Sequence, residues 1–232
     1  MVSAHRPREL RVMTYNVRSL RDDVDALAEV IRACAPDVLL VQEAPRFLRW
    51  RSKRAALARK AGLVVATTDR PGGLCIMTAL RVDLLDTGFV RLPKAPRRHQ
   101  RVVVSATIRS VGGVIWGVAT LHFSTDPAER RAHVPVVTET LSSSAPAPLV
   151  VGGDINEDPD GPVFTELASR YQDCFAVSGR GTGLTSPASA PRRRIDAIFA
   201  DPSLTVVSCE AVGSPAVGAG SDHRPVLAVV TQ

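Results

Sequence analysis

Runs of apolar, largely β-branched residues recur along the whole chain, separated by polar segments that contain glycine and proline. Short runs of this kind, bounded by turn residues, are typical of β-strands. They predict strands at residues 10–17, 38–42, 63–67, 102–108, 114–121, 149–151, 195–199, 205–207 and 226–230. Strands are therefore expected over the full length of the chain.

A different pattern, with the spacing of an α-helix, occupies residues 24–34. Apolar side chains follow Val24 at intervals of three, seven and ten positions, which predicts one buried helix face. Asp22 and Asp23 precede this segment, where negative charge favours the positive end of the helix dipole, and Pro36 follows it. We expect this helix to pack one face on a sheet.

A second helix is predicted to begin at Asp126. Asp126 can cap it, Pro127 suits the first helical position and Glu129 occupies the capping-box position. Pro135 argues against a long straight continuation, because proline removes a hydrogen bond from a helix interior.

The connections predict how these elements assemble. Residues 109–113 contain two glycines and have the length of a hairpin connection, so the flanking strands should be antiparallel neighbours. No internal repeat or linker divides the chain, and we expect one domain over residues 10–232 after a flexible stretch at 1–9. Many strands with several helices predict packed sheets with helices outside, an α/β layered sandwich.

Composition narrows the class of protein. Of the 232 residues, 45% are hydrophobic and 22% are charged, which excludes a disordered or collagen-like chain. The longest apolar runs fall short of the roughly 18–20 residues that span a membrane. No apolar leader segment follows the N-terminus, so we expect a cytoplasmic protein without stable membrane association, and a monomer.

The cysteines do not form a recognisable site. They lie far apart with no pair separated by two residues, which excludes a readable thiolate zinc site or disulfide framework. Buried free thiols are expected at Cys34, Cys75, Cys174 and Cys209.

Charge indicates the kind of partner. Lys and Arg number 29 against 23 Asp and Glu, and this net charge of +6 favours polyanions such as nucleic acid. Arginine-rich runs at 46–54, 97–101 and 192–194 could bind phosphate through paired hydrogen bonds, or could be solvated faces. Arg101 and Arg194 are the candidates for a substrate phosphate.

The remaining aromatic residues and histidines carry little signal. Aromatic residues make up only 4% of the chain, which gives weak support to a base-stacking platform. Trp50 and Trp116 are predicted to be packing residues. His5, His99 and His133 match no motif and are predicted to lie on the surface.

Polar side chains recur at the ends of the predicted strands, where open α/β architectures place their sites. They are Asn16, Glu43, His122, Asp154, Asn156, Asp196, Asp222 and His223. Each alone could be a turn former, a helix cap or a structural histidine. Asp196 is the exception, because a carboxylate among apolar strand residues needs a cation, a histidine or a metal as its partner.

The segment from Gly152 to Asn156 adds detail. Its two glycines permit a close backbone approach, and Asp154 and Asn156 can point to the same side of an extended segment. A phosphate or its metal would fit there.

In this order and spacing, several segments resemble the signature set of the endonuclease/exonuclease/phosphatase superfamily, which includes deoxyribonuclease-I-like nucleases. They are Thr14-Tyr15-Asn16, Gln42-Glu43, Leu121-His122, Gly153-Asp154-Ile155-Asn156, Arg194-Ile195-Asp196 and Ser221-Asp222-His223-Arg224-Pro225-Val226. The resemblance spans residues 11 to 230. It implies a four-layered sandwich of two packed mixed β-sheets flanked by helices, with the site at one end.

The resemblance also implies roles for these residues. Glu43 would be the principal ligand of a divalent metal, with Asn16 and Asp222 close to the same ion or its waters. Asp154 and Asn156 would position the attacking water and the phosphate. His223, oriented by Asp196, would act as general base or as a donor to phosphate oxygens, and His122 would act as general acid.

Two positions bear on the subfamily. His122 resembles deoxyribonuclease-like, sphingomyelinase-like and phosphatase-like members, whereas apurinic endonucleases have a tyrosine there, so the resemblance disfavours abasic-site repair. Residues 121–125 with the following Glu129-Arg130-Arg131 also resemble the tyrosyl-DNA phosphodiesterase branch. Where many members carry Gly-Asn-Ala before a strand, this chain has Gly72-Gly73-Leu74-Cys75 and lacks the asparagine.

The donor set and the charge lead to three functional hypotheses. Oxygen ligands without paired cysteines suit Mg²⁺ or Mn²⁺ better than zinc. The first hypothesis is a metal-dependent hydrolase of phosphodiester bonds in nucleic acid, a nuclease. The second is a phosphatase or phospholipase-C-like enzyme on a phosphorylated small molecule or lipid, and the third is a non-catalytic nucleic-acid-binding module.

Overall fold

Two mixed β-sheets form the centre of the molecule. The computed structural model describes residues 8–67, 71–143 and 148–232. The first sheet contains, in spatial order, β10 (Gly179–Arg180), β12 (Thr205–Ala211), β13 (Val226–Thr231), β1 (Glu9–Asn16), β2 (Val38–Gln42), β4 (Cys75–Ala79) and β3 (Leu63–Val65). The second contains β5 (Asp83–Arg91), β6 (Val102–Arg109), β7 (Ile115–His122), β8 (Leu149–Asp154), β11 (Asp196–Ala200) and β9 (Gln172–Asp173).

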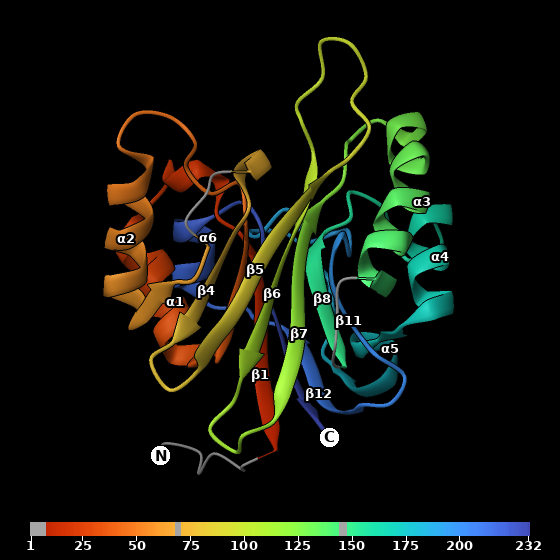
Figure 1. The fold of residues 1–232 in the computed structure, drawn as a ribbon. Helices are drawn as coiled ribbons and strands as arrows, with labels where there is room; N and C mark the ends of the chain where they lie inside the picture. The colour runs from red at the N-terminus through yellow and green to blue at the C-terminus, as the bar shows by residue number, and fades with distance from the viewer. Residues whose placement is uncertain (1–7, 68–70, 144–147) are drawn as a thin grey trace.

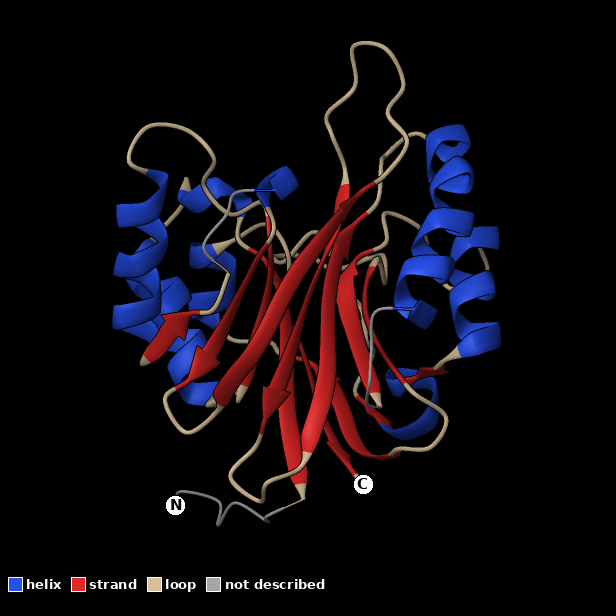
Figure 2. Ribbon diagram, viewed as in Figure 1, coloured by secondary structure: helices blue, strands red, loops and turns tan. Residues whose placement is uncertain are grey.

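Helices cover both outer faces of this pair of sheets. They are α1 (Val24–Cys34), α2 (Trp50–Ala61), α3 (Pro127–Ser143), α4 (Pro162–Arg170), α5 (Cys174–Ser178) and α6 (Pro215–Gly220), with 3-10 turns at Arg18–Leu20 and Pro71–Gly73. Figure 1 shows α1, α2 and α6 on one side and α3 and α4 on the other. Figure 2 shows the strands enclosed between these two helical layers. The predicted four-layered α/β sandwich is confirmed.

The sheets pack face to face through their central strands. β1 contacts β8 and β11 of the other sheet, and β2 contacts β7 and β8. Gly152 in β8 is one reason that they approach closely, since a Cβ there would lie 3.0 Å from a methyl carbon of Leu40. The glycine predicted to allow a close approach therefore meets the opposite sheet.

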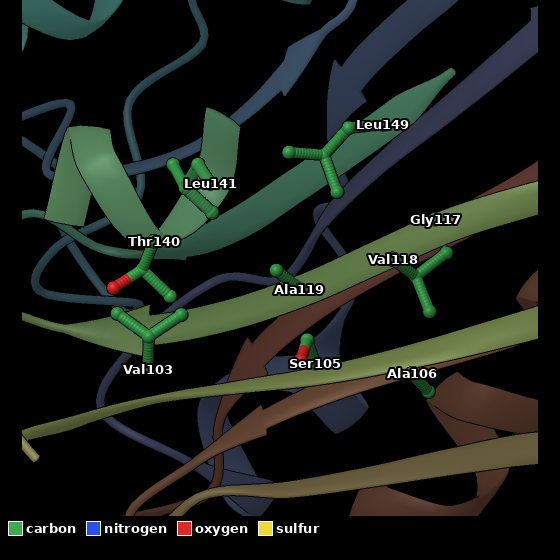
Figure 3. Close-up of a pocket in the computed structure, with 9 residues that line it drawn as sticks. All are labelled: Val103, Ser105, Ala106, Gly117, Val118, Ala119, Thr140, Leu141 and Leu149. Carbon is green, nitrogen blue, oxygen red and sulfur yellow. The ribbon is translucent and has the colours of Figure 1, made fainter. Parts of the chain in front are cut away.

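A smaller apolar cluster lies between the second sheet and its helices. Leu141 of α3 packs there with Val103, Ala119 and Leu149 of the sheet, and all four are buried. Figure 3 shows these side chains around a void of about 10 Å³. A void of this size, about one water-sized probe, indicates that α3 packs closely on the sheet.

Most of the strands predicted from the sequence are found within a few residues of their expected limits, and α1 matches residues 24–34. β6 and β7 are antiparallel across the glycine-containing turn, as predicted. Both sheets also contain a parallel pair, β1 with β2 and β7 with β8. All four cysteines are buried and free, which confirms that prediction. Trp116 is fully buried, as expected of a packing residue.

The prediction for the second helix was wrong in one respect. α3 begins at Pro127 but continues through Pro135 to Ser143. Pro135 is exposed, and so is Arg131, whose carbonyl would have accepted the missing hydrogen bond. Because solvent can satisfy that carbonyl, the proline is tolerated.

His133 was wrongly placed on the surface. Its side chain is fully buried, its ring stacks on Phe123 with centroids 6.1 Å apart, and its Nε2 lies 2.9 Å from the carbonyl oxygen of Pro93. The signal was the helical spacing of His133 with Val137 and Leu141, which are both buried. His99 is exposed as predicted, and His5 lies outside the described residues.

The flexible stretch predicted at residues 1–9 lies largely outside the described residues. Residues 1–7 lie outside the described residues, and Glu9 already belongs to β1. Across the described part of the chain, no helix has the length and apolar character to cross a bilayer.

Candidate active site

Three predicted site residues occupy one row of the second sheet. β7 and β8 run parallel and end side by side, so His122 pairs with Asp154 in register. β11 runs antiparallel to β8, so its first residue, Asp196, pairs with Asp154 from the other side. The sheet register therefore places a histidine and two carboxylates next to one another at one end of the sandwich.

The first sheet brings an amide and a further carboxylate to the same end. Asn16 ends β1, and Glu43 directly follows β2. The Asn16 Nδ2 donates to Glu43 Oε1 at 3.4 Å and to Asp154 Oδ2 at 3.1 Å. Asn16 therefore links carboxylates that belong to opposite sheets.

The segment before β13 adds His223. Ser221 is buried, and its hydroxyl donates to the Asn16 carbonyl at 2.6 Å and accepts from the His223 backbone N–H at 3.3 Å. The His223 Nδ1–H donates to Asp196 Oδ2 at 2.8 Å, which leaves Nε2 4.0 Å from Asp154 Oδ2. The pairing of Asp196 with a histidine, one of the partners expected from the sequence, is thus present.

The structure brings most of the predicted site residues into one group. We call it the central cluster, and its members are Asn16, Glu43, His122, Asp154, Asp196 and His223. Within it, His122 Nε2 lies 3.3 Å from Asp154 Oδ2.

Two predicted residues lie at the edge of this cluster. Asn156 donates its backbone N–H to Asp154 Oδ1 at 2.9 Å and its side-chain Nδ2 to the carbonyl oxygen of Phe123 at 3.1 Å. Asp222 is half exposed and forms an ion pair with Arg18, at 3.3 Å from Nε to Oδ2. The predicted metal ligand Asp222 is therefore paired with an arginine in this structure.

The two candidate phosphate-binding arginines have different surroundings. Arg101 is partly buried, and burial lowers its pKa, whereas the charges of the Asp154 and Glu43 carboxylates oppose that shift. Arg194 instead forms a two-point ion pair with Asp173, at 2.7 and 3.0 Å.

Arg194 is also held by aromatic rings. Its guanidinium lies 4.9 Å from the ring centroid of Phe164 and 5.2 Å from that of Phe175. These contacts and Asp173 occupy the guanidinium of Arg194, which gives it a packing role, and its role as a phosphate ligand stays a prediction.

Burial and neighbouring charges act oppositely on the two histidines. Burial disfavours the charged form of His223, but the Asp196 carboxylate outweighs it and raises the pKa of His223 to about 10. Burial lowers the pKa of His122 well below its usual 6.5, and the positive charges around it act in the same direction. Burial raises the pKa of Asp154, and the charge of Asp196 adds to the effect.

Sequence reasoning missed buried residues that hold the strands of this cluster together through hydrogen bonds. Gln42 Nε2 donates to Thr14 Oγ1 at 2.9 Å and to Thr120 Oγ1 at 2.8 Å, which joins the two sheets through fully buried polar side chains. The signal was present, since a glutamine that ends an apolar strand run must find buried partners. Thr185 Oγ1, also buried, accepts the backbone N–H of Asp196 at 3.2 Å, and only the tertiary structure reveals that contact.

The oxygen and nitrogen atoms of the central cluster that could act as metal ligands fit a divalent cation. One oxygen of Asp196, Oδ1, is buried and has no hydrogen-bond partner among the described residues. Ligand atoms of Asp154, Asp196 and His223 lie within 4.8 Å of one another, and Glu43 is joined to Asp154 through Asn16. Carboxylate oxygens are ligands that Mg²⁺ and Mn²⁺ prefer, so Glu43 and Asp154 could hold such an ion.

Two packed mixed sheets with acids and histidines gathered at one end define an α/β sandwich with a candidate active site at that end. The family model described as the Endonuclease/Exonuclease/phosphatase family matches residues 13–223, and the chain therefore belongs to this family. This family membership makes the chain a hydrolase of the superfamily. No curated protein matches the chain by sequence.

Solved structures share the fold at low sequence identity. A mannosyl-6-phosphatase of Bacteroides thetaiotaomicron is 17% identical with a TM-score of 0.82, and the match covers 96% of this chain and 100% of that one. TDP2 of D. rerio, in complex with a single-stranded DNA product, is 19% identical with a TM-score of 0.74, over 97% of this chain and 99% of that one. The human Nocturnin catalytic domain with bound sulfate is 19% identical with a TM-score of 0.72, over 98% and 95%.

Proposed function

We propose that the protein is a Mg²⁺- or Mn²⁺-dependent hydrolase of phosphodiester bonds, with nucleic acid as its substrate. The observation that carries this proposal is the pair of hydrogen bonds from Asn16 to Glu43 and Asp154, beside the Asp196–His223 pair. These hydrogen bonds bring carboxylates from both sheets and an oriented imidazole close together.

The chemistry needs an activated water, neutralised phosphate oxygens and a proton for the leaving alkoxide. A bound divalent ion supplies Lewis acidity toward the phosphate. Asp154, held by the Asn156 backbone N–H, is placed to orient the attacking water. His223 is fixed by Asp196 with Nε2 toward Asp154, so this nitrogen is placed to exchange a proton with the reacting groups.

The remaining site residues have proposed roles in leaving-group protonation, phosphate binding and metal binding. His122 lies across Asp154 from Asp196 and is proposed to protonate the leaving group once the phosphate is bound. Arg101, with its charge beside Asp154 and Glu43, is proposed to bind a non-bridging phosphate oxygen. Asn16, Glu43 and Asp222 are proposed to hold the metal or its waters, with Asp222 first leaving its ion pair with Arg18.

Nucleic acid is favoured as the substrate by the net charge of +6 and by Arg101 at the site. The fold shared with TDP2 in complex with single-stranded DNA is consistent with this substrate. A phosphorylated small molecule is the second candidate, and the fold shared with a mannosyl-6-phosphatase favours it. A non-catalytic binding module would not require this combination of acids, amide and histidines.

Hydrolysis of bis(p-nitrophenyl) phosphate tests the reaction. We expect turnover with Mg²⁺ or Mn²⁺ that EDTA abolishes, and losses of about 10²–10⁴-fold or more in Glu43→Ala and His223→Ala. Glu166→Ala is the matched control, because Glu166 pairs with Arg170 on the exposed face of α4. Wild-type rates in folded Glu43→Ala and His223→Ala would refute the assignment.

A substrate panel then separates the candidates. One enzyme preparation is compared on single-stranded DNA, duplex DNA, RNA, sphingomyelin and inositol phosphates. The highest kcat/KM is expected for a nucleic acid. A cytoplasmic location and a monomeric state stay predictions from the sequence.

A further inference from the structure

Two adjacent large apolar side chains project into solvent from the loop that directly follows Glu43, a member of the central cluster. Phe47 is 75% exposed and Leu48 is 82% exposed, and both belong to the loop of residues 44–49 that follows Glu43. We call this segment the apical loop. Adjacent exposed apolar residues near a site commonly contact a ligand or partner.

The base of the apical loop is fixed, although its tip is exposed. The Ala44 backbone N–H donates to the carbonyl oxygen of Gly73 at 2.7 Å, and Arg54 Nε donates to the carbonyl oxygen of Pro45 at 3.1 Å. The side chain of Arg46 lies against Gly73, where a Cβ would be 3.1 Å from Arg46 Cδ. Phe47 is therefore presented from an anchored segment.

The apical loop begins directly after Glu43 and carries the positive charges of Arg46 and Arg49. The charge of Arg46 contributes to lowering the pKa of His122 and of Arg101. The Arg46 guanidinium also lies 5.6 Å from the ring centroid of Phe47. The ring thus lies beside the positive charge of Arg46, which could attract a phosphate.

The neighbouring aromatic residue does not offer a comparable surface. The guanidinium groups of Arg51 and Arg54 lie 4.4 and 4.8 Å from the Trp50 ring centroid, and Trp50 is only partly exposed. Phe47 is therefore the ring of this loop that is placed to stack on a ligand.

A second projecting loop carries positive charge without exposed large apolar side chains. Residues 92–101, the basic loop, contain exposed Lys94, Arg97, Arg98 and His99. Arg98 pairs with Asp126 at 2.8 Å, which ties this loop to the start of α3 just after His122. Figure 1 shows the apical and basic loops at the same end of the sandwich.

This distribution favours a polyanionic strand over a lipid surface. Cations occur on both loops, so a chain crossing the site would meet positive charge on each side. Of these two loops, only the apical loop carries large exposed apolar side chains, which suits one stacked base better than insertion of a broad face into a membrane. His122 and Asp154 are almost fully buried, so a flexible single strand can reach them more readily than a duplex.

From these contacts we infer that Phe47 is a stacking subsite for the nucleobase next to the scissile phosphate of single-stranded nucleic acid, with Leu48 packed beside it. The inference rests on the proposed function, since it names the substrate class of the same site. The low aromatic content of the chain does not oppose it, because one exposed ring in the right place is sufficient.

Binding without hydrolysis gives the first test. Fluorescence anisotropy of fluorescein-labelled oligothymidylate is measured in EDTA, with wild-type protein and with Phe47→Ala, Phe47→Leu and Phe47→Trp. Loss of one base–aromatic stack is expected to weaken binding about 5- to 100-fold in Phe47→Ala. Phe47→Trp should bind as tightly as wild type, and Phe47→Leu should resemble Phe47→Ala.

The matched control lies at the far end of the molecule. Val111 is 63% exposed in the turn between β6 and β7, and Figure 1 shows that turn at the end opposite to the apical loop. Val111→Ala should leave oligothymidylate binding unchanged. Because Phe47 and Val111 are exposed, circular dichroism should show all these variants folded.

Hydrolysis gives the second test. Phe47→Ala should raise KM for a single-stranded oligonucleotide and leave kcat/KM for bis(p-nitrophenyl) phosphate unchanged, because the small diester has no base to stack on Phe47. Stacking on Phe47 with no hydrolysis of any substrate would overturn the proposed function alone.

Three results would overturn the inference itself. Wild-type protein could fail to bind the oligonucleotide, Phe47→Ala could bind it as tightly as Val111→Ala, or Phe47→Leu could bind it as tightly as Phe47→Trp.

Sedimentation with vesicles of phosphatidylglycerol and phosphatidylcholine tests a lipid surface as the alternative partner. Vesicle binding that falls in Phe47→Ala, with oligonucleotide binding intact, would assign the loop to a lipid surface.

Discussion

At the residue scale, the chemistry of the site depends on how a few polar side chains are oriented. Glu43 has a φ of 51° and Asn156 a φ of 56°, so both have left-handed backbone conformations, which are uncommon for a glutamate. The identities of these residues were predictable from their positions after apolar strands. Their partners were not, because contacts such as Thr185 with Asp196 join residues whose spacing carries no local pattern.

Asp196 is expected to act through His223. In Asp196→Asn, the imidazole loses the carboxylate that orients it, so kcat for bis(p-nitrophenyl) phosphate should fall by about 10²–10⁴-fold. KM should change much less than kcat. Asp158→Asn is the control, because Asp158 pairs with the exposed Arg193, and equal kcat in the two variants would contradict the orienting role of Asp196.

Arg194 and Arg101 should give opposite results. Arg194→Ala leaves the largely buried Asp173 without its partner, and breaking such a pair should lower the free energy of unfolding by about 3–5 kcal/mol. Activity per folded molecule should be retained.

Arg101→Ala should lower kcat/KM with little loss of stability. Urea unfolding and steady-state kinetics check both, and a raised KM in a fully stable Arg194→Ala would instead support Arg194 as a substrate contact.

At the element scale, burial decides which strands and helices can be predicted. Strands such as β2 have every residue buried and stand out as apolar runs. β5 is an edge strand with every residue exposed, and α2 is rich in Arg and Lys with few buried positions. Neither has a strong periodic pattern, so both were missed. The tolerance of α3 for Pro135 likewise depends on its exposed face.

The buried His133 of α3 should make stability depend on pH. Burial lowers the pKa of His133 below the 6.5 of an unfolded histidine, and its Nδ1 is buried without a partner among the described residues. Below pH 6.5 the unfolded chain binds the proton first, so this contribution to stability is complete above that pH and is lost as pH falls.

His133→Phe removes this titration. Urea unfolding at pH 7.5 and 5.0 should show a smaller loss of stability on acidification for His133→Phe than for wild type, with other titrating groups common to both. Equal losses in the two proteins would show that His133 does not titrate in this way.

At the scale of the whole molecule, the site exists because two sheets end at the same place. The Asn16–Asp154 hydrogen bond joins residues 138 positions apart, and the Ser221–Asn16 bond joins residues 205 apart. Layered α/β architecture followed from counting strands and helices. The strand orders did not, because pairing β11 beside β8 is a property of the folded topology. The family resemblance implied two mixed sheets with the site at one end, but not the order of their strands.

Mn²⁺ binding to the purified protein tests the central claim most directly, because it reports the metal site without requiring turnover. Isothermal titration calorimetry of wild type, Glu43→Gln and the exposed control Glu166→Gln, each first treated with EDTA and dialysed, compares the three affinities. The account predicts saturable binding by wild type and Glu166→Gln, and strongly weakened binding by Glu43→Gln. Equal Mn²⁺ affinity in all three proteins, or none in wild type, would contradict it.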